Sequence, residues 1–236
     1  LVRLYSGDGL SHAGGIFSSG VPTTIRETVE SYSPKAGRKE PKSHFVDVTT
    51  LSEPTSVDRD DLGDAQRRAA DWLLDATRTG AGTHLLVYPA AGMQPGMRAT
   101  KRRATVDVLT SDVDQISQMR EALVLEGADD SIHVERIPGV VPDPKQWHGH
   151  YDAIVTVEKV EQLGPTERKG YIRAVDRFLT PNGRAAIQSI VATDSMTEAG
   201  RASLQALRAY IWPSLDYPLT TDLHQLVDKN SNLRIV

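Results

Sequence analysis

The stretch Tyr151-Asp-Ala-Ile-Val-Thr-Val157 decides the fold class, because it is a short and mostly apolar run. Such a run is typical of a buried strand in a parallel sheet. Pro165 then begins a helix whose apolar positions recur at helical spacing, and the turn Thr180-Pro-Asn-Gly183 leads into a second strand, 184–191. We expect a positive φ angle at Gly183. Strand, helix and strand in this order predict a right-handed βαβ unit.

The same alternation continues on both sides of this unit. We predict further strands over 84–88, 104–110, 132–136 and 233–236, and helices over 60–76, from Ser111 or Asp112 onward, over 195–212 and over 221–229. This order predicts an α/β fold, a mostly parallel sheet with helices on both faces. Ligands of such sheets bind beyond the carboxyl ends of the strands, which here means the loop after Tyr88 and the ends at Thr110 and Val157.

Residues 1–58 have a different composition, with many glycines and a Pro- and Lys/Arg-containing stretch. Turn-forming residues at this density predict an irregular or helical segment with one short helix over Thr23–Ser31. We expect two units, a segment 1–58 that serves as a lid and an α/β domain 59–236. Because the chain begins with Leu1 instead of Met, a segment upstream of it is expected to be missing.

The composition excludes several classes of protein. The chain has 236 residues, of which 39% are hydrophobic and 25% charged, so it can bury a core and is not disordered. Its net charge of -4 argues against a nucleic-acid binder. It has no cysteine, which excludes disulfides, thiolate zinc sites and cysteine nucleophiles. No window is apolar enough to span a membrane and no signal peptide is evident, so we expect a cytoplasmic protein that is not an integral membrane protein.

Five motifs occur in the order known from one enzyme family. They are Leu62-Gly-Asp-Ala-Gln66, the segment from Leu109-Thr110 to Gln115, Asp152-Ala-Ile-Val-Thr-Val-Glu-Lys-Val-Glu-Gln-Leu-Gly164, Arg177-Phe-Leu-Thr-Pro-Asn-Gly-Arg184 and Tyr210-Ile-Trp-Pro213. Together they resemble the cyclopropane-fatty-acid synthase family of methyltransferases that use S-adenosylmethionine (SAM). The resemblance covers about residues 60–236 and implies a Rossmann-like SAM-methyltransferase fold.

The resemblance also implies a cofactor site. Thr110 and Gln115 match the family residues that contact the ribose and methionine parts of SAM; their alternatives are a strand end and an exposed first-turn residue. In the glycine-rich loop, Tyr88 replaces the acidic residue and Ala90 replaces a glycine, whereas Gly92 is kept. Because Ala90 and Gly92 are small, they still permit a close approach of a cofactor.

The catalytic part of the family pattern is incomplete. The synthases hold a bicarbonate ion with Glu, His, Cys and Tyr side chains. Glu161 matches the glutamate, but Gln162 occupies the place of the histidine, and an amide does not titrate. Ring closure by the family mechanism is therefore not expected. Glu158 and Glu161 are three residues apart and are our candidates for a base or polar anchor; the alternative for both is a solvated or capping acid.

Two other groups of residues have side chains that could bind a ligand. His148, His150 and Asp152 have a spacing that could hold a metal, but polar residues are common in a loop that enters a strand, and we predict no metal site. The basic cluster of Arg98, Lys101, Arg102 and Arg103 could attract an acidic group, although a solvated helical face is the favoured interpretation.

The sequence thus predicts a SAM-dependent methyltransferase-like protein that acts on a small apolar or lipid-like acceptor and is not a true cyclopropane synthase. Methyl transfer depends mainly on alignment of the reacting atoms, so the missing histidine does not preclude it. The alternative is a non-methylating homologue, either a partner subunit or a fold reused for a reaction such as cyclisation. Homo- or hetero-oligomers fit both hypotheses.

Overall fold

The computed structural model describes residues 25–31, 44–51, 59–88, 92–139, 141–143, 149–192, 196–210 and 216–236. The elements in chain order are β1 (Ile25–Ser31), β2 (His44–Leu51), α2 (Arg59–Ala76), β3 (His84–Val87), α3 (Gln94–Lys101), β4 (Thr105–Thr110), α4 (Val113–Glu126), β5 (Ile132–Arg136), β6 (Tyr151–Val157), the 3₁₀ helix η1 (Val160–Gln162), α5 (Pro165–Phe178), β7 (Leu179–Gln188), α6 (Glu198–Tyr210) and α7 (Thr220–Asn230).

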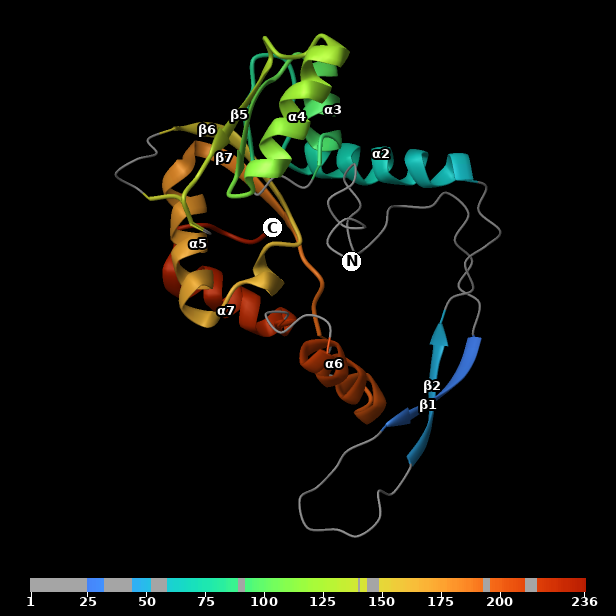
Figure 1. Ribbon diagram of the computed structural model, residues 1–236. Helices are drawn as coiled ribbons and strands as arrows, with labels where there is room; N and C mark the ends of the chain where they lie inside the picture. The colour runs from blue at the N-terminus through green and yellow to red at the C-terminus, as the bar shows by residue number, and fades with distance from the viewer. Residues whose placement is uncertain are drawn as a thin grey trace.

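Five strands form one parallel sheet in the order β5-β4-β3-β6-β7 (Figure 1). The predicted α/β fold class is therefore confirmed. The strand order reverses between β3 and β6, because the chain first builds outward to β5 and then returns to the other side of β3. Ligands of doubly wound sheets bind at such a switch point, beyond the carboxyl ends of the strands.

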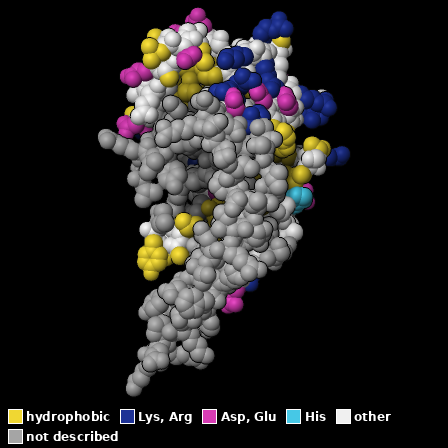
Figure 2. All heavy atoms as spheres, turned by 90° about the vertical axis from the view of Figure 1, so that its right-hand side faces the viewer, with side chains coloured by type: hydrophobic (Ala, Val, Ile, Leu, Met, Phe, Trp, Pro, Cys, Tyr) yellow, Lys and Arg dark blue, Asp and Glu magenta, His cyan; other side chains and the backbone are white. Residues whose placement is uncertain are grey.

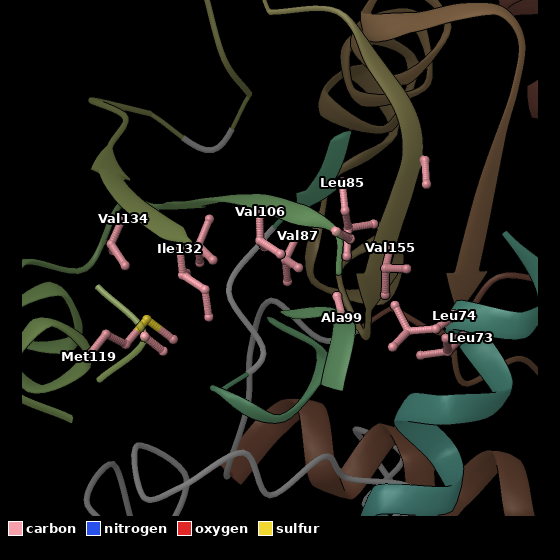
Figure 3. Packing of buried hydrophobic residues seen from close by; sticks show 14 of the residues in the cluster. Leu73, Leu74, Leu85, Val87, Ala99, Val106, Met119, Ile132, Val134 and Val155 are labelled. Atoms are coloured by element: carbon pink, nitrogen blue, oxygen red, sulfur yellow. The ribbon is translucent and has the colours of Figure 1, made fainter. Parts of the chain in front are cut away.

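The two faces of the sheet have separate cores. On one face, α2, α3 and α4 pack against the strands through aliphatic side chains, among them Leu74, Ala99 and Met119 (Figure 3). On the other face, α5 and α7 cover a core that includes Tyr151 and Tyr171. Alternate residues of each central strand point to opposite faces, which fixes the strand register.

The expected helix over Thr23–Ser31 is wrong. Residues Ile25–Ser31 form β1, which pairs antiparallel with β2 from Ile25↔Leu51 to Ser31↔His44. The paired residues are between 13 (Ser31 and His44) and 26 (Ile25 and Leu51) positions apart, so local composition did not reveal the pairing. The division of the chain at residue 58 and the lid function of the first segment stay predictions.

Three details near the C-terminal half also differ from expectation. Strand β7 begins at Leu179 and contains the predicted turn as an irregularity in its pairing with β6. The positive φ angle (69°) is at Asn182 and not at Gly183; a Cβ at Gly183 would lie 2.9 Å from the carbonyl oxygen of Thr180, so glycine is needed there for space. Residues 233–236 form no strand; just before them, the backbone N–H of Asn232 donates to the Asp176 carboxylate of α5 (3.2 Å).

Candidate functional site

The carboxyl ends of β3 and β4 carry the predicted cofactor-binding residues. Gly92 lies between β3 and α3 and has a φ angle of 77°. In this left-handed region a side chain would be strained, so the glycine serves the conformation of the loop. Ala90 lies outside the described residues. Strands β3 and β4 are hydrogen-bonded neighbours, so the loop that Gly92 belongs to and the end of β4 follow adjacent strands.

Thr110 and Gln115, two of the predicted cofactor-binding residues, are in contact. Thr110 is the last residue of β4 and is buried, and its hydroxyl donates a hydrogen bond of 2.7 Å to the side-chain oxygen of Gln115. Asp112 caps α4 through the backbone N–H groups of Asp114 and Gln115, which holds the first turn of the helix against the strand end. The result is a neutral hydroxyl–amide pair at the edge of the sheet.

Glu158 directly follows β6 and is strained. It is 4% exposed and has a φ angle of 54°, which is uncommon for any residue with a side chain. Its backbone is held on both sides: its N–H donates to Gln188 O (2.8 Å), and the Gln162 amide donates to its carbonyl oxygen (2.6 Å). Strained backbone conformations cluster at functional sites. The amide that occupies the place of the family's histidine therefore helps to fix the backbone of Glu158.

Glu161 lies on η1 and is 1% exposed. Its carboxylate accepts hydrogen bonds from the hydroxyl of Ser189 (2.7 Å) and the N–H of Ile190 (3.1 Å), both just after β7. The interpretation of Glu158 and Glu161 as solvated acids is wrong, since both are buried. Glu161 anchors the end of β7 to η1, whereas Glu158 is fixed through its backbone.

Comparison with known proteins identifies the family. Residues 54–236 match the model of the family described as mycolic acid cyclopropane synthetase. The chain belongs to this family. It is also 28% identical over 192 residues to the tuberculostearic acid methyltransferase UfaA1 of Mycobacterium tuberculosis, covering 81% of this chain and 43% of that protein. The chain thus spans less than half the length of this relative.

Solved structures show the same fold. The cyclopropane synthase MmaA2 from Mycobacterium tuberculosis aligns with a TM-score of 0.59 at 18% identity, covering 72% of this chain and 61% of that chain. The mycolic acid cyclopropane synthase CmaA1, complexed with SAH and CTAB, gives 0.60 at 19% identity, with 73% and 63% covered. The [4+2]-cyclase SpnF gives 0.56 at 18% identity, with 89% and 64% covered. The fold is therefore the Rossmann-like fold of SAM methyltransferases.

This family member holds three buried hydroxyl groups close to its sheet, those of Tyr88, Tyr171 and Thr156. Tyr88 and Tyr171 are fully buried with ring centroids 5.5 Å apart, and burial raises the pKa of both phenols. Tyr171 lies near the hydroxyl of Thr156, yet neither of these two hydroxyls has a hydrogen bond of regular geometry within the described part of the chain. The alternation of residues along β3 places Tyr88 on the α5 face of the sheet. The alternation of side chains along the predicted strand was the sequence signal that could have placed Tyr88 on this face.

Two of the four residues of the basic cluster, Arg98 and Arg102, form ion pairs. Arg98 and Arg102 of the α3 region bind Asp71 of α2 at 2.5 and 3.0 Å, and Arg102 also binds Asp75 at 2.5 Å. Burial alone would raise the pKa of Asp71, but the two guanidinium groups lower it on balance. Basic and acidic side chains accordingly alternate in the upper part of Figure 2. These arginines join two helices, which leaves little reason to assign them to a ligand.

Two further findings concern metals and membranes. The described residues contain no group of three or more His, Asp or Glu side chains that could hold a metal ion. His148 lies outside the described residues, and His150 is exposed. Within the same part of the chain, no helix combines the length and the apolar character required to cross a membrane.

Proposed function

We propose that this chain is a SAM-dependent methyltransferase-like protein that acts on a small apolar or lipid-like acceptor and does not form cyclopropane rings. The observation that carries the proposal is the hydrogen-bonded pair of Thr110 and Gln115 at the end of β4, next to the loop with the left-handed Gly92. Membership in the family supports the reaction class. The relative named as a tuberculostearic acid methyltransferase supports a lipid-like acceptor.

The residues present fit the cofactor. The amide of Gln115 and the hydroxyl of Thr110 are neutral groups that can hydrogen-bond ribose hydroxyls. Gly92 has no side chain and has a left-handed φ angle, so the backbone of this loop can come close to a ligand. SAM, when bound there, would supply an activated methyl group. This chain's own residues would orient it, and alignment is the main requirement for methyl transfer.

Ring closure is not proposed, because the chain has no imidazole in the place where its family places one. The amide of Gln162 is already engaged with the carbonyl oxygen of Glu158, and an amide cannot carry a proton away. Transfer of a methyl group without deprotonation at carbon is compatible with Glu158 and Glu161. The acceptor side of the site is therefore proposed to be built around these carboxylates.

Calorimetric titration with SAM and with S-adenosylhomocysteine tests the cofactor proposal. We expect micromolar binding of both by the full chain. Gly92→Leu should weaken binding by at least about tenfold, since it puts a side chain into the loop. Gly82→Leu is the matched control: Gly82 has a φ angle of 79° and no atom within 4 Å of an added Cβ, so it bears the same backbone strain at the other end of β3. Unchanged affinity of Gly92→Leu would contradict the placement of the loop.

A second candidate is a non-methylating homologue. The specific observation in its favour is Tyr88, whose buried ring occupies the place of the acidic residue that the family uses in the loop. The [4+2]-cyclase SpnF, a protein of this fold, is a precedent for its reuse in a cyclisation. Absence of heat and of any thermal shift at millimolar SAM would favour this candidate over the methyltransferase.

A further inference from the structure

The helix η1, which carries Glu161, is too short to hold its conformation by itself. It has three residues, and its hydrogen bonds run from Gln162 N–H to Lys159 O (3.0 Å) and from Leu163 N–H to Val160 O (3.3 Å). Helices of one turn are marginal in isolation, and their last carbonyl groups need partners outside the helix. The direction in which η1 presents the side chain of Glu161 therefore depends on contacts from other segments.

Arg168 of α5 supplies one of these contacts. Its side chain is only 11% exposed, and its Nε donates to the carbonyl oxygen of Val160 (2.8 Å). Arg168 lies close to the N-terminus of α5, where the helix dipole disfavours a cation, and arginine is rarely buried unless it is paired. The local energetics of α5 therefore do not explain an arginine at this position, whereas its contacts with η1 do.

Asp216 supplies the second contact and is itself bound by Arg168. The N–H of Asp216 donates to the carbonyl oxygen of Glu161 (2.8 Å). One terminal nitrogen of Arg168 lies 3.1 Å from a carboxylate oxygen of Asp216, and the other donates to the Asp216 carbonyl oxygen. Because a guanidinium is planar, it fixes the directions of these contacts. Arg168 and Asp216 together thus hold two successive carbonyl oxygens of η1, those of Val160 and Glu161.

The side chain of Glu161 points away from these contacts to the end of β7. Its carboxylate is buried and accepts hydrogen bonds from the Ser189 hydroxyl (2.7 Å) and the Ile190 N–H (3.1 Å). A buried carboxylate needs such donors in the right directions, because it has lost its water. A rotation of η1 would move the carboxylate away from them. Glu161 is therefore held at its backbone by Asp216 and at its carboxylate by the end of β7.

We propose that Arg168 is a positioning residue for Glu161. Together with Asp216 it sets the orientation of η1 in which the Glu161 carboxylate meets Ser189 and Ile190. The inference rests on the proposed function, which builds the acceptor side of the site around this carboxylate, and it names the residue that keeps the carboxylate in place. No motif of the sequence pointed to Arg168.

NMR of the full chain labelled with ¹⁵N-isoleucine tests the positioning function. The amide signal lost in Ile190→Val belongs to Ile190, and Glu161→Gln shows where this signal moves when its acceptor loses the charge. Arg168→Leu should move the Ile190 signal in the same direction. It should also speed the solvent exchange of this amide, relative to that of Ile154, by about tenfold, the ratio that corresponds to one hydrogen bond. Ile154 is buried in β6 and reports on overall stability.

The comparison of two amides separates positioning from stability. If Arg168 only stabilised the fold, Arg168→Leu would speed exchange at Ile190 and Ile154 alike and leave the Ile190 signal of the folded protein in place, and this result would overturn the inference. Arg208→Leu is the matched control, because Arg208 also reaches the Asp216 carboxylate (3.4 Å) but has an exposed side chain. We expect it to leave the Ile190 signal unmoved, and an equal shift in both variants would contradict a specific function of Arg168.

Two further measurements complete the test. If Arg168→Leu does not fold, Arg168→Lys keeps the charge but not the planar set of donors and should still move the Ile190 signal. Calorimetry with S-adenosylhomocysteine examines the proposed function separately, and we expect Arg168→Leu to change this affinity by less than about twofold, since Gly92, Thr110 and Gln115 lie on other segments. A parent chain without affinity would refute the proposed function, whereas the Ile190 signal alone decides the positioning of Glu161.

Discussion

The two edges of the parallel sheet treat buried polar groups differently. At the amino edge, the Tyr151 hydroxyl donates to a carboxylate oxygen of Asp107 (2.7 Å), and His84 Nε2 lies 3.2 Å from the same oxygen. At the carboxyl edge, the buried Thr110 and Glu161 side chains are hydrogen-bonded, but the hydroxyls of Tyr171 and Thr156 have no hydrogen bond of regular geometry within the described part of the chain. Tyr151, Tyr171 and Thr156 are all buried, so burial is not the difference.

This difference in hydrogen bonding distinguishes the amino edge of the sheet, which serves stability, from the carboxyl edge, which carries the candidate site. Where the sheet only has to be stable, buried polar atoms find partners, as they do in most of a folded protein. Near the switch point, two buried hydroxyls lack a hydrogen bond of regular geometry among the described residues, and Glu158 has a positive φ angle. Local conflicts of this kind concentrate at functional sites. The carboxyl edge, which has these hydroxyls and the strained glutamate, is also the edge at which doubly wound sheets bind ligands.

The largest effect is expected from Tyr151→Phe. The change removes a hydrogen bond to a carboxylate at a fully buried position and should lower the free energy of unfolding by about 2 kcal/mol. Urea denaturation of the full chain measures it. Binding of S-adenosylhomocysteine should be unaffected, because the residue lies at the opposite end of β6 from Glu158. A loss below about 0.5 kcal/mol would mean that the amino edge is not the better-bonded one.

A smaller effect on stability is expected at Glu158, where the free energies of unfolding of two variants are compared. Glu158→Gly should be more stable than Glu158→Ala by about 1 kcal/mol, because only glycine adopts a φ angle of 54° without strain. The control is Glu121, exposed inside α4, where alanine should be the more stable by about 1 kcal/mol. Thermal and urea denaturation of the four variants provide the numbers. Equal stability of the two Glu158 variants would show that its backbone is not strained.

The smallest effect is expected from Tyr171→Phe. Removing a buried hydroxyl that has no regular hydrogen bond should leave the free energy of unfolding within about 0.5 kcal/mol of the parent, or raise it. Tyr151→Phe is the matched control, a tyrosine equally buried on the same face of the sheet. If both changes destabilise alike, the hydroxyl of Tyr171 is bonded after all and the contrast between the edges fails.

Much of the domain could be predicted from the sequence. The helices α2, α4 and α5 and the strands β3 to β6 lie where apolar periodicity placed them, within a few residues. Side-chain spacing of three and four, or a short apolar run, is local information. The predictions for Thr23–Ser31 and for residues 233–236 were wrong. The first segment pairs with a strand further along the chain, which local composition does not show. The second segment has no strand partner among the described residues.

The residues of the candidate site could be named from the sequence, but their contacts could not. Thr110, Gln115, Glu158 and Glu161 could be named from motif order alone. The structure brought Thr110 to Gln115, engaged Glu161 with Ser189 and turned Glu158 into a strained residue. Each of these depends on contacts between segments or on a backbone angle, and neither is visible in a motif.

The sequence by itself determined the family, the parallel sheet and the edge at which sheets of this kind bind ligands. Strand periodicity and motif order can be recognised from the order of residues along the chain, without knowledge of contacts between segments. Only the tertiary structure decided which groups share that edge. Ser189 and Ile190 belong to no motif, and they bind the carboxylate of Glu161 just after the end of β7. Such a placement is fixed by hydrogen bonds between segments far apart in sequence, and these form only when the chain is folded.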